Sequence, residues 1–282
     1  MKSVEEVLRL GASGVVYAST IGGHLALGDR NTLDERAPEA ISFNDSFDVA
    51  SITKIMSTTA ILMELINSEE IALSDCASSF LPEWKGEKTE ITIEDLLRHR
   101  SGLAPWRPLY IRHKSVESAR EAIATEPLVH GVNKVRAYSD LGFISLGEII
   151  SKVTGQSFNE AFNQIVKEPF GLSQTQFAHA LTSAVSTSRG DRFEREMVET
   201  NTPYQVPESA DEFKGWRSYV LKGEVNDGNA FHLFKGISSH AGLFTTAQDL
   251  LTFSEEISQH DLFPLFTQPG PDEGAHLGFM SW

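Results

Sequence analysis

A serine and a lysine stand three residues apart, at Ser51 and Lys54, where a run of apolar residues with helical spacing begins. The apolar positions recur every three or four residues as far as Ile66, as they do on one face of an α-helix. Residues 51 and 54 then lie on one face a single turn apart, so their side chains can meet. A lysine among apolar residues needs a reason, because lysine is almost never fully buried without a partner. The pattern predicts a buried helix over about 51–67 that carries a serine–lysine pair on its first turn.

This pair suggests nucleophilic catalysis. A serine hydroxyl is a weak nucleophile until a neighbouring base takes its proton. A lysine held among apolar groups near a helix N-terminus loses proton affinity, through desolvation and through the positive end of the helix dipole. Neutral Lys54 is therefore the candidate base and Ser51 the candidate nucleophile. The motif alone is a weak signal, because Ser-x-x-Lys also arises by chance at ordinary helix starts.

Charge and cysteine content exclude several classes of protein. The 24 Lys and Arg residues against 39 Asp and Glu residues give a formal charge of −15, which opposes binding to nucleic acid and to anionic lipid surfaces. The single cysteine, Cys76, excludes an internal disulfide and a cysteine-rich zinc site. The nine histidines form no ligand set with acids at helical spacing, so no metal is expected.

The N-terminus bears on localisation. Residues 1–10 mix charges with apolar residues at helical spacing and lack the uninterrupted apolar core of a signal peptide. No segment approaches the apolar length of a membrane span. The sequence as given predicts a soluble, cytoplasmic protein, or a periplasmic or secreted one if an export signal has been removed.

Strand-like runs occur near both ends of the chain. The runs at 14–18 and 24–28 flank a glycine pair and predict an antiparallel hairpin, and 276–282 reads as a further strand. Thr92 and Thr246 each stand where a threonine caps a helix. Further helices are expected at about 1–10, 116–124, 141–150 and 158–166. The polar stretch 174–224 is read as a lid or side wall.

These elements predict an α+β protein. Its antiparallel sheet is built from N- and C-terminal segments and packed with helices, beside a mostly helical lobe. At 282 residues the chain fits a single catalytic domain of two lobes. The expected α/β lobe takes about 1–50 and 223–282, and the helical lobe takes 51–222.

Four segments occur in the order that is typical of one known superfamily. Residues 51–54, 96–103, 138–140 and 240–250 resemble the motifs of the serine β-lactamase-like superfamily, which includes penicillin-binding proteins. The chain is most similar to its class C β-lactamase and carboxylesterase branch, which also contains D,D-peptidases and D-aminopeptidases. The resemblance implies a β-lactamase/transpeptidase-like fold and a hydrolase that works through an acyl-enzyme without a cofactor.

The resemblance also implies residue roles. Ser51 would be the acylated nucleophile and Lys54 its proton partner, while Tyr138 matches the tyrosine of the family's Tyr-x-Asn element and would shuttle a proton. A phenol does this only beside a cation, and Lys54 is the candidate. Asp140 replaces the usual asparagine. A carboxylate cannot donate to a substrate carbonyl as an amide does, so Asp140 is expected either to hold Lys54 charged or to orient a substrate amine.

Two further positions are candidate substrate-binding residues, His240 at the mouth of the site and Gly242. His99 is expected to form a local hydrogen bond at the end of its helix. The backbone amide of Ser51 is one plausible oxyanion donor. In this family the second donor comes from a strand with Lys-Thr-Gly or His-Thr-Gly, and the segment from 240 to 242 is only a superficial substitute.

No such strand motif precedes Trp282. The sequence leaves three explanations: a truncated C-terminus that lacks the terminal strands, the absence of ordinary catalysis, or another segment that fills the gap. Truncation is favoured here. It would expose a sheet edge that invites strand addition and self-association.

The sequence constrains the substrate poorly, because one fold serves esterases, peptidases and lactamases. Short acyl esters or D-amino-acid peptides are the first expectation. β-Lactams and D,D-peptides are the runner-up, and a catalytically silent module that binds peptidoglycan peptide is the alternative. The expected partner is thus a small ester, amide or peptide, with no nucleic acid and no membrane span.

Overall fold

The computed structural model describes residues 4–9, 12–29, 33, 39–177 and 181–280, and its helices and strands mix along the chain as an α+β fold. The helices are α1 Val4–Arg9, α2 Ala60–Asn67, α3 Ile93–Leu97, α4 Leu109–Arg112, α5 Val116–Thr125, α6 Asp140–Thr154, α7 Phe158–Phe162, α8 Arg192–Thr200, α9 Gly228–His232, α10 Ala247–Gln259 and α11 Phe263–Thr267. The strands are β1 Gly14–Ala18, β2 His24–Gly28, β3 Phe47–Asp48, β4 Gln176–Phe177, β5 Ser186–Arg189, β6 Val220–Lys222 and β7 Leu243–Thr245.

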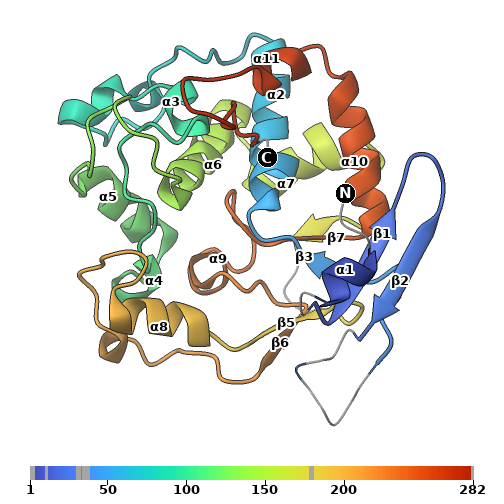
Figure 1. Ribbon diagram of the computed structural model, residues 1–282. Helices are drawn as coiled ribbons and strands as arrows, with labels where there is room; N and C mark the ends of the chain where they lie inside the picture. Colours follow the sequence, from blue (N-terminus) through green and yellow to red (C-terminus); the bar gives the residue numbers. More distant parts are fainter. Residues whose placement is uncertain (1–3, 10–11, 30–32, 34–38, 178–180, 281–282) are drawn as a thin grey trace.

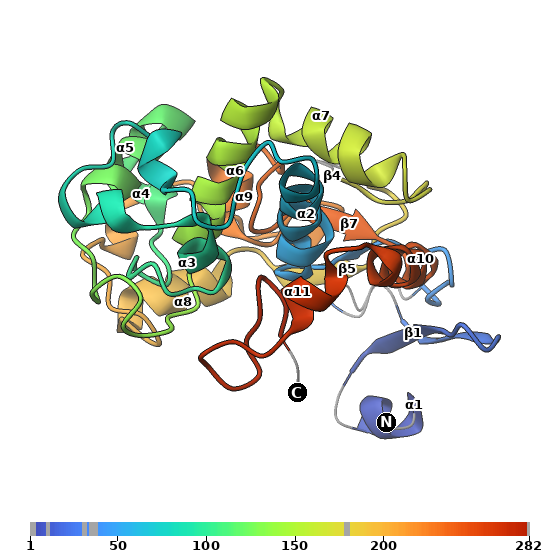
Figure 2. The same ribbon diagram turned by 90° about the horizontal axis from the view of Figure 1, so that it is seen from above.

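Helix α2 lies between two groups of elements (Figure 1). Helices α3, α4, α5, α6 and α8 gather on one side of α2, and α10 with the β1–β2 hairpin lies on the other. Figure 2 shows α1 and β1 at the edge of the molecule, away from α3, α4, α5, α6 and α8. The division into two lobes of one domain stays a prediction.

The strands form three small antiparallel sheets rather than one large sheet. The hairpin β1–β2 is confirmed, with Gly14 opposite Gly28. Strand β7 lies between β3 and β4, where Phe47 pairs with Thr245 and Gln176 pairs with Phe244. N- and C-terminal segments therefore meet in the three-stranded sheet, as expected, but among the described residues the hairpin does not join it.

The serine–lysine segment begins with a wide turn. Residues Lys54–Thr59 form a π-helix that continues into α2, instead of the uniform α-helix expected. Met56 and Thr58 of this turn are fully buried. Single π-helical turns occur frequently at functional sites. The following residues of α2 fill the core, as the apolar period predicted, with Ile61, Leu62 and Met63.

Helix α6 places the 138–140 segment against this core. The Ser139 hydroxyl accepts a hydrogen bond from the Gly142 amide at 3.1 Å and caps the helix, which ends at Gly155. At Gly147 a Cβ atom would lie 2.3 Å from the Ser239 hydroxyl, so only glycine lets the helix approach this loop. Helix α6 thus holds the 238–240 segment in place.

Two sequence interpretations need correction. The stretch 174–224 contains α8 and the β5–β6 pair, so it is more regular than its polar composition indicates. Residues 276–280 form a tight turn rather than a strand, with the His276 amide 2.9 Å from the Phe279 carbonyl oxygen. The turn forms because Gly278 adopts a left-handed backbone, with φ of 75°, and packs against Thr59. The rest of the expected strand, 281–282, lies outside the described residues.

The remaining helix predictions are confirmed. Thr92 and Thr246 cap α3 and α10, and helices stand at the positions expected for α5, α6 and α7. Of the first expected helix, Val4–Arg9 is described. None of the helices in the described part of the chain is both long and apolar enough to cross a bilayer.

Candidate active site

A strained turn carries Ser51. Ala50, just before it, has φ of 45°, which is uncommon for a residue with a side chain. The Asp48 carboxylate holds this turn, because its Oδ1 accepts from the Ala50 amide at 2.9 Å and its Oδ2 accepts from the Asn226 amide at 2.8 Å. Burial raises the pKa of Asp48. Asp48 thereby links the turn that carries Ser51 to the loop before α9.

Ser51 and Lys54 meet as their spacing predicts. Lys54 Nζ lies 2.9 Å from Ser51 Oγ and donates to the His240 carbonyl oxygen at 3.0 Å. Lys54 is 2% exposed, and its ammonium group lies 5.0 Å from the centroid of the Tyr138 ring. The three candidate catalytic residues line one cavity of about 290 Å³, together with residues of the turn at 276–280.

Asp140 forms an ion pair with Lys54, with Oδ1 2.7 Å from Nζ. Burial alone would lower the pKa of Lys54, but the Asp140 carboxylate and the Tyr138 hydroxyl outweigh it, and the pKa is raised. The expectation of a neutral Lys54 is therefore wrong for this resting site. Of the two roles considered for Asp140, the geometry favours holding Lys54 charged.

His240 is buried rather than at the mouth of the site, because its ring is 1% exposed. Its Nε2 lies 3.0 Å from Asp227 Oδ1 and its Nδ1 lies 2.8 Å from the Ser238 hydroxyl. Burial raises the pKa of Asp227, but His240, the Ala230 amide and Lys54 outweigh it and lower that pKa to about 2. His240 meets Lys54 through its backbone carbonyl, so its contribution to substrate binding stays a prediction.

One set of groups has the composition of a metal site. Donor atoms of Asp140, Asp227 and His240 lie within 4.8 Å of one another. The Lys54 ammonium already contacts the carboxylate of Asp140 and the carbonyl of His240. Lysine thus supplies positive charge at this point, and a cation beside it would be repelled.

His99 supports Tyr138, a role that the sequence did not reveal. The centroids of the His99 and Tyr138 rings lie 4.3 Å apart, and His99 Nδ1 accepts from the Ser139 amide at 2.9 Å. Burial and the charges of Lys54 and Arg136 lower the pKa of His99 to about 3, so the ring is neutral. Its backbone is left-handed, with φ of 57°. A histidine at a helix end gives no sequence signal of such long-range stacking.

Gly242 has a backbone role. Its φ is 108°, and a Cβ atom there would lie 2.5 Å from the Gly236 carbonyl oxygen. It is not among the described residues that line the Ser51 cavity. Substrate binding by Gly242 stays a prediction.

Comparison with known proteins places this geometry in a family. A β-lactamase family model matches residues 4–280. The chain belongs to the β-lactamase family. It is 27% identical over 229 residues to the "N-acetylmuramyl-L-alanine amidase" of Bacillus subtilis, covering 76% of this chain and 50% of that protein. It is 28% identical over 221 residues to the "Putative D-alanyl-D-alanine carboxypeptidase" of Escherichia coli, covering 72% of this chain and 48% of that protein.

Solved structures of several other proteins share the fold. FmtA from Staphylococcus aureus superposes with a TM-score of 0.67 and 20% identity, over 99% of this chain and 74% of that one. D-alanine carboxypeptidase AmpC from Burkholderia cenocepacia superposes with a TM-score of 0.70 and 14% identity, over 96% and 70%. A class C β-lactamase is equally similar, with a TM-score of 0.70, 15% identity and coverage of 94% and 67%. The chain spans about half the length of the curated relatives it matches.

Proposed function

We propose that the chain is a serine hydrolase that forms an acyl-enzyme on Ser51. The observation that carries the proposal is the 2.9 Å contact between Lys54 Nζ and Ser51 Oγ inside a cavity that Tyr138 also lines. A buried ammonium beside the hydroxyl stabilises the negative charge that develops on Oγ during attack.

The proton of Ser51 then needs an acceptor other than Lys54. Lys54 is held charged by Asp140, so we assign the acceptor role to the Tyr138 hydroxyl. Oγ attacks the substrate carbonyl carbon and passes its proton to the Tyr138 oxygen, while the Tyr138 hydroxyl gives its own proton to the leaving group and the bond to the leaving group breaks. A water molecule afterwards releases the acyl group by the same route in reverse.

For the substrate, we propose amides or peptides that contain D-amino acids. The name of one relative, "Putative D-alanyl-D-alanine carboxypeptidase", supports D-amino acids, and that of the other, "N-acetylmuramyl-L-alanine amidase", supports an amide bond. Short esters, β-lactams and a silent peptide-binding module remain the competing readings.

Covalent labelling tests the acyl-enzyme. The intact mass after incubation with a fluorophosphonate is expected to rise by one adduct in the parent protein and to stay unchanged in Ser51→Ala. Ser57→Ala is the matched control, because Ser57 lies on the same segment but is buried, donating to the Thr53 carbonyl at 2.6 Å. Equal labelling of Ser51→Ala and the parent would refute the proposal.

A substrate panel separates the readings. It contains a D-alanyl-D-alanine peptide, N-acetylmuramyl-L-alanine, p-nitrophenyl acetate and butyrate, and nitrocefin, each assayed with the parent and with Ser51→Ala. Serine-dependent turnover of the D-alanyl-D-alanine peptide supports the proposed substrate class, whereas turnover of N-acetylmuramyl-L-alanine alone supports an amidase without a preference for D-amino acids. Turnover of the esters or of nitrocefin alone supports the esterase or the lactamase, and peptide binding without turnover of any compound supports the silent module.

A further inference from the structure

A second cavity lies outside the candidate active site. It has a volume of about 550 Å³ and is enclosed by α6, the start of α7, part of α5 and the loop that follows α9. Among the described residues, none that lines it also lines the Ser51 cavity. Its volume is in the range of small-molecule sites. It is therefore large enough to bind a ligand of its own.

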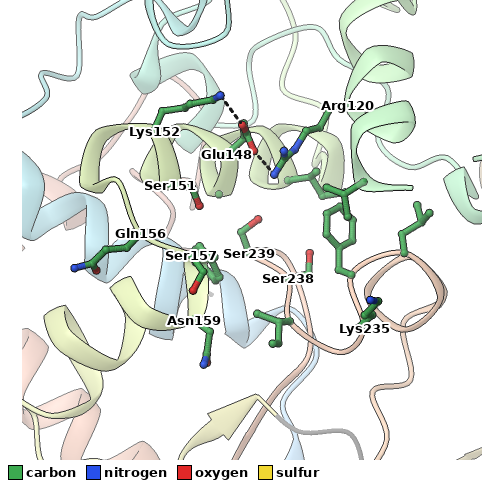
Figure 3. Close-up of a pocket in the computed structure, with 17 residues that line it drawn as sticks. Arg120, Glu148, Ser151, Lys152, Gln156, Ser157, Asn159, Lys235, Ser238 and Ser239 are labelled. Carbon is green, nitrogen blue, oxygen red and sulfur yellow. Dashed lines mark ion pairs between the residues drawn. The ribbon is translucent and has the colours of Figure 1, made fainter. Parts of the chain in front are cut away.

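The charge of this cavity is opposite to that of the chain. Three basic side chains, Arg120, Lys152 and Lys235, line it with a single acid, Glu148, whereas acids outnumber basic residues in the whole sequence. Glu148 is 8% exposed and pairs with both Arg120 and Lys152 (Figure 3). One acid between two cations leaves a net positive charge on this wall, so the cavity attracts anions.

Lys235 stands apart from this network. Figure 3 shows it across the cavity from Arg120 and Lys152. In the part of the chain that the structure describes, its ammonium group has no ion-pair or hydrogen-bond partner. Its backbone is left-handed, with φ of 52°, and is followed by Gly236, whose amide donates to the Ala230 carbonyl at 2.8 Å. The Lys235 side chain is exposed and lines the cavity, so its ammonium group is available to an anion there.

The rest of the lining offers hydrogen bonds and apolar contact. Within the described ranges, the Ser151 hydroxyl and the Asn159 amide form no hydrogen bond, although both line the cavity. Phe158, Phe234 and Ile237 supply apolar surface beside them. Free hydroxyl and amide groups next to aromatic rings suit a ring-shaped ligand that has both C–H faces and hydroxyl groups.

We propose that this cavity binds a small anionic sugar, a hexose-sized ring with a carboxylate or a phosphate group. The anion would contact Lys235 and the Arg120 side of the cavity, and the ring hydroxyls would bind Ser151 and Asn159. Ser239, which lines this cavity, also contacts the helical segment that follows Ser51, because its carbonyl oxygen accepts from the Thr58 hydroxyl at 2.6 Å. The proposal does not depend on the chemistry proposed for Ser51.

Titration with defined sugars tests this site. Glucuronate and glucose 6-phosphate are the anionic probes and glucose is the neutral control, followed by calorimetry and by NMR of the labelled full chain. The dissociation constant is expected to be about 1 mM or lower for an anionic probe and at least tenfold higher for glucose. Binding of both anions indicates a general anion site, and binding of only one identifies the carboxylate or the phosphate as its ligand. Failure of both to bind more tightly than glucose would overturn the proposal.

Variants locate the binding. Lys235→Glu is expected to weaken binding of the anionic probe at least tenfold. Lys214→Glu is the control, because it makes the same charge change at an exposed lysine that does not line the cavity, and it should weaken binding less than twofold. NMR shifts should appear at Ser151 and Asn159, and Ser51→Ala should bind as the parent does. Unchanged binding by Lys235→Glu, or shifts confined to the Ser51 cavity, would refute this location.

Discussion

Lys54 and Asp140 form the ion pair around which the candidate active site is built, with 2.7 Å between Nζ and Oδ1. Lys54 is 3% exposed at its side chain and Asp140 is 17% exposed, so the pair is largely shielded from water. The pair orients the ammonium group toward Ser51 Oγ, 2.9 Å away. Because the carboxylate raises the pKa of Lys54, it also keeps the lysine charged.

Replacement of Asp140 by asparagine should lower the pKa of Lys54, because burial then outweighs the remaining interactions. In the parent, the raised pKa of Lys54 stabilises the fold. This stabilisation is fully present below the unfolded pKa of 10.5 and is lost only as pH rises through the folded pKa. Asp140→Asn should lose about 3 kcal/mol at neutral pH, as when one partner of a buried ion pair is removed.

Two measurements check this prediction. NMR titration of 13C-labelled lysine follows Lys54, and urea unfolding at pH 7 gives the free energy. Glu94→Gln is the control, since it removes an exposed i,i+4 partner of Arg98 and should cost less than about 1 kcal/mol. An unchanged Lys54 titration in Asp140→Asn would show that the carboxylate does not hold the proton.

His99 should act as a positioning residue for Tyr138. We expect His99→Asn, which tolerates the left-handed backbone, to reduce kcat about tenfold or more on any substrate that the parent hydrolyses, with little change in KM. The reason is that loss of the stacked ring at 4.3 Å frees the Tyr138 side chain. A rise in KM with unchanged kcat would instead place His99 in ground-state binding.

The lowered pKa of His99 also predicts that the fold loses stability in acid. Its folded pKa of about 3 lies below the unfolded value of 6.5, so the unfolded state binds more protons between these values. Stability should fall as pH drops from 6.5 toward 3, by up to about 1 kcal/mol for each pH unit. His99→Asn should reduce this slope in urea unfolding, whereas the same change at exposed His130 should leave it intact.

The sequence predicted the features that depend on neighbouring residues. Ser51 and Lys54 meet because three residues make about one helical turn, and Thr92 and Thr246 cap helices through amides three residues away. The hairpin β1–β2 follows likewise from two short runs and the glycines between them.

Contacts between distant segments were not predictable in this way. His240 meets Asp227 only because the loop after α9 folds back, and the π-helical turn at Lys54–Thr59 leaves no mark in the apolar period. For the charge of Lys54 the sequence left two expectations open, a neutral base and a lysine that Asp140 holds charged, and only the fold decides between them. Burial can be read from the local pattern, but the position of the Asp140 carboxylate depends on how α6 packs.

Helix α8 lies in the stretch 174–224, for which the sequence predicted no helix. Glu194 connects α8 to α9. Its Oε1 accepts from the Gly228 amide at 2.6 Å and its Oε2 accepts from the Tyr110 hydroxyl at 2.8 Å. Burial and the charge of Asp227 raise the pKa of Glu194 to about 8. Above 4.5 the unfolded state gives up this proton first, so stability should fall as pH rises from 4.5 to about 8.

Glu194→Gln should remove that dependence, because glutamine keeps an acceptor and has no proton to lose. Its stability relative to the parent is expected to increase between pH 5 and pH 8 in urea unfolding. Glu199→Gln on the same helix is the matched control, since Glu199 is exposed and pairs only with Arg195 among the described residues. A constant difference between Glu194→Gln and the parent across this range would contradict the assignment.

Gly242 separates backbone strain from a steric clash. In Gly242→Ala the new Cβ would meet the Gly236 carbonyl oxygen at 2.5 Å while φ is 108°, so we expect a loss of about 3 kcal/mol in the free energy of unfolding. Gly155→Ala is the control. There φ is 68° and nothing lies within 4 Å of the added atom, so only the left-handed backbone is penalised, by about 1 kcal/mol. Denaturant unfolding of both variants measures the difference. Equal losses would mean that the chain at Gly236 shifts to make room, and the 236–242 loop would then be softer than its packing indicates.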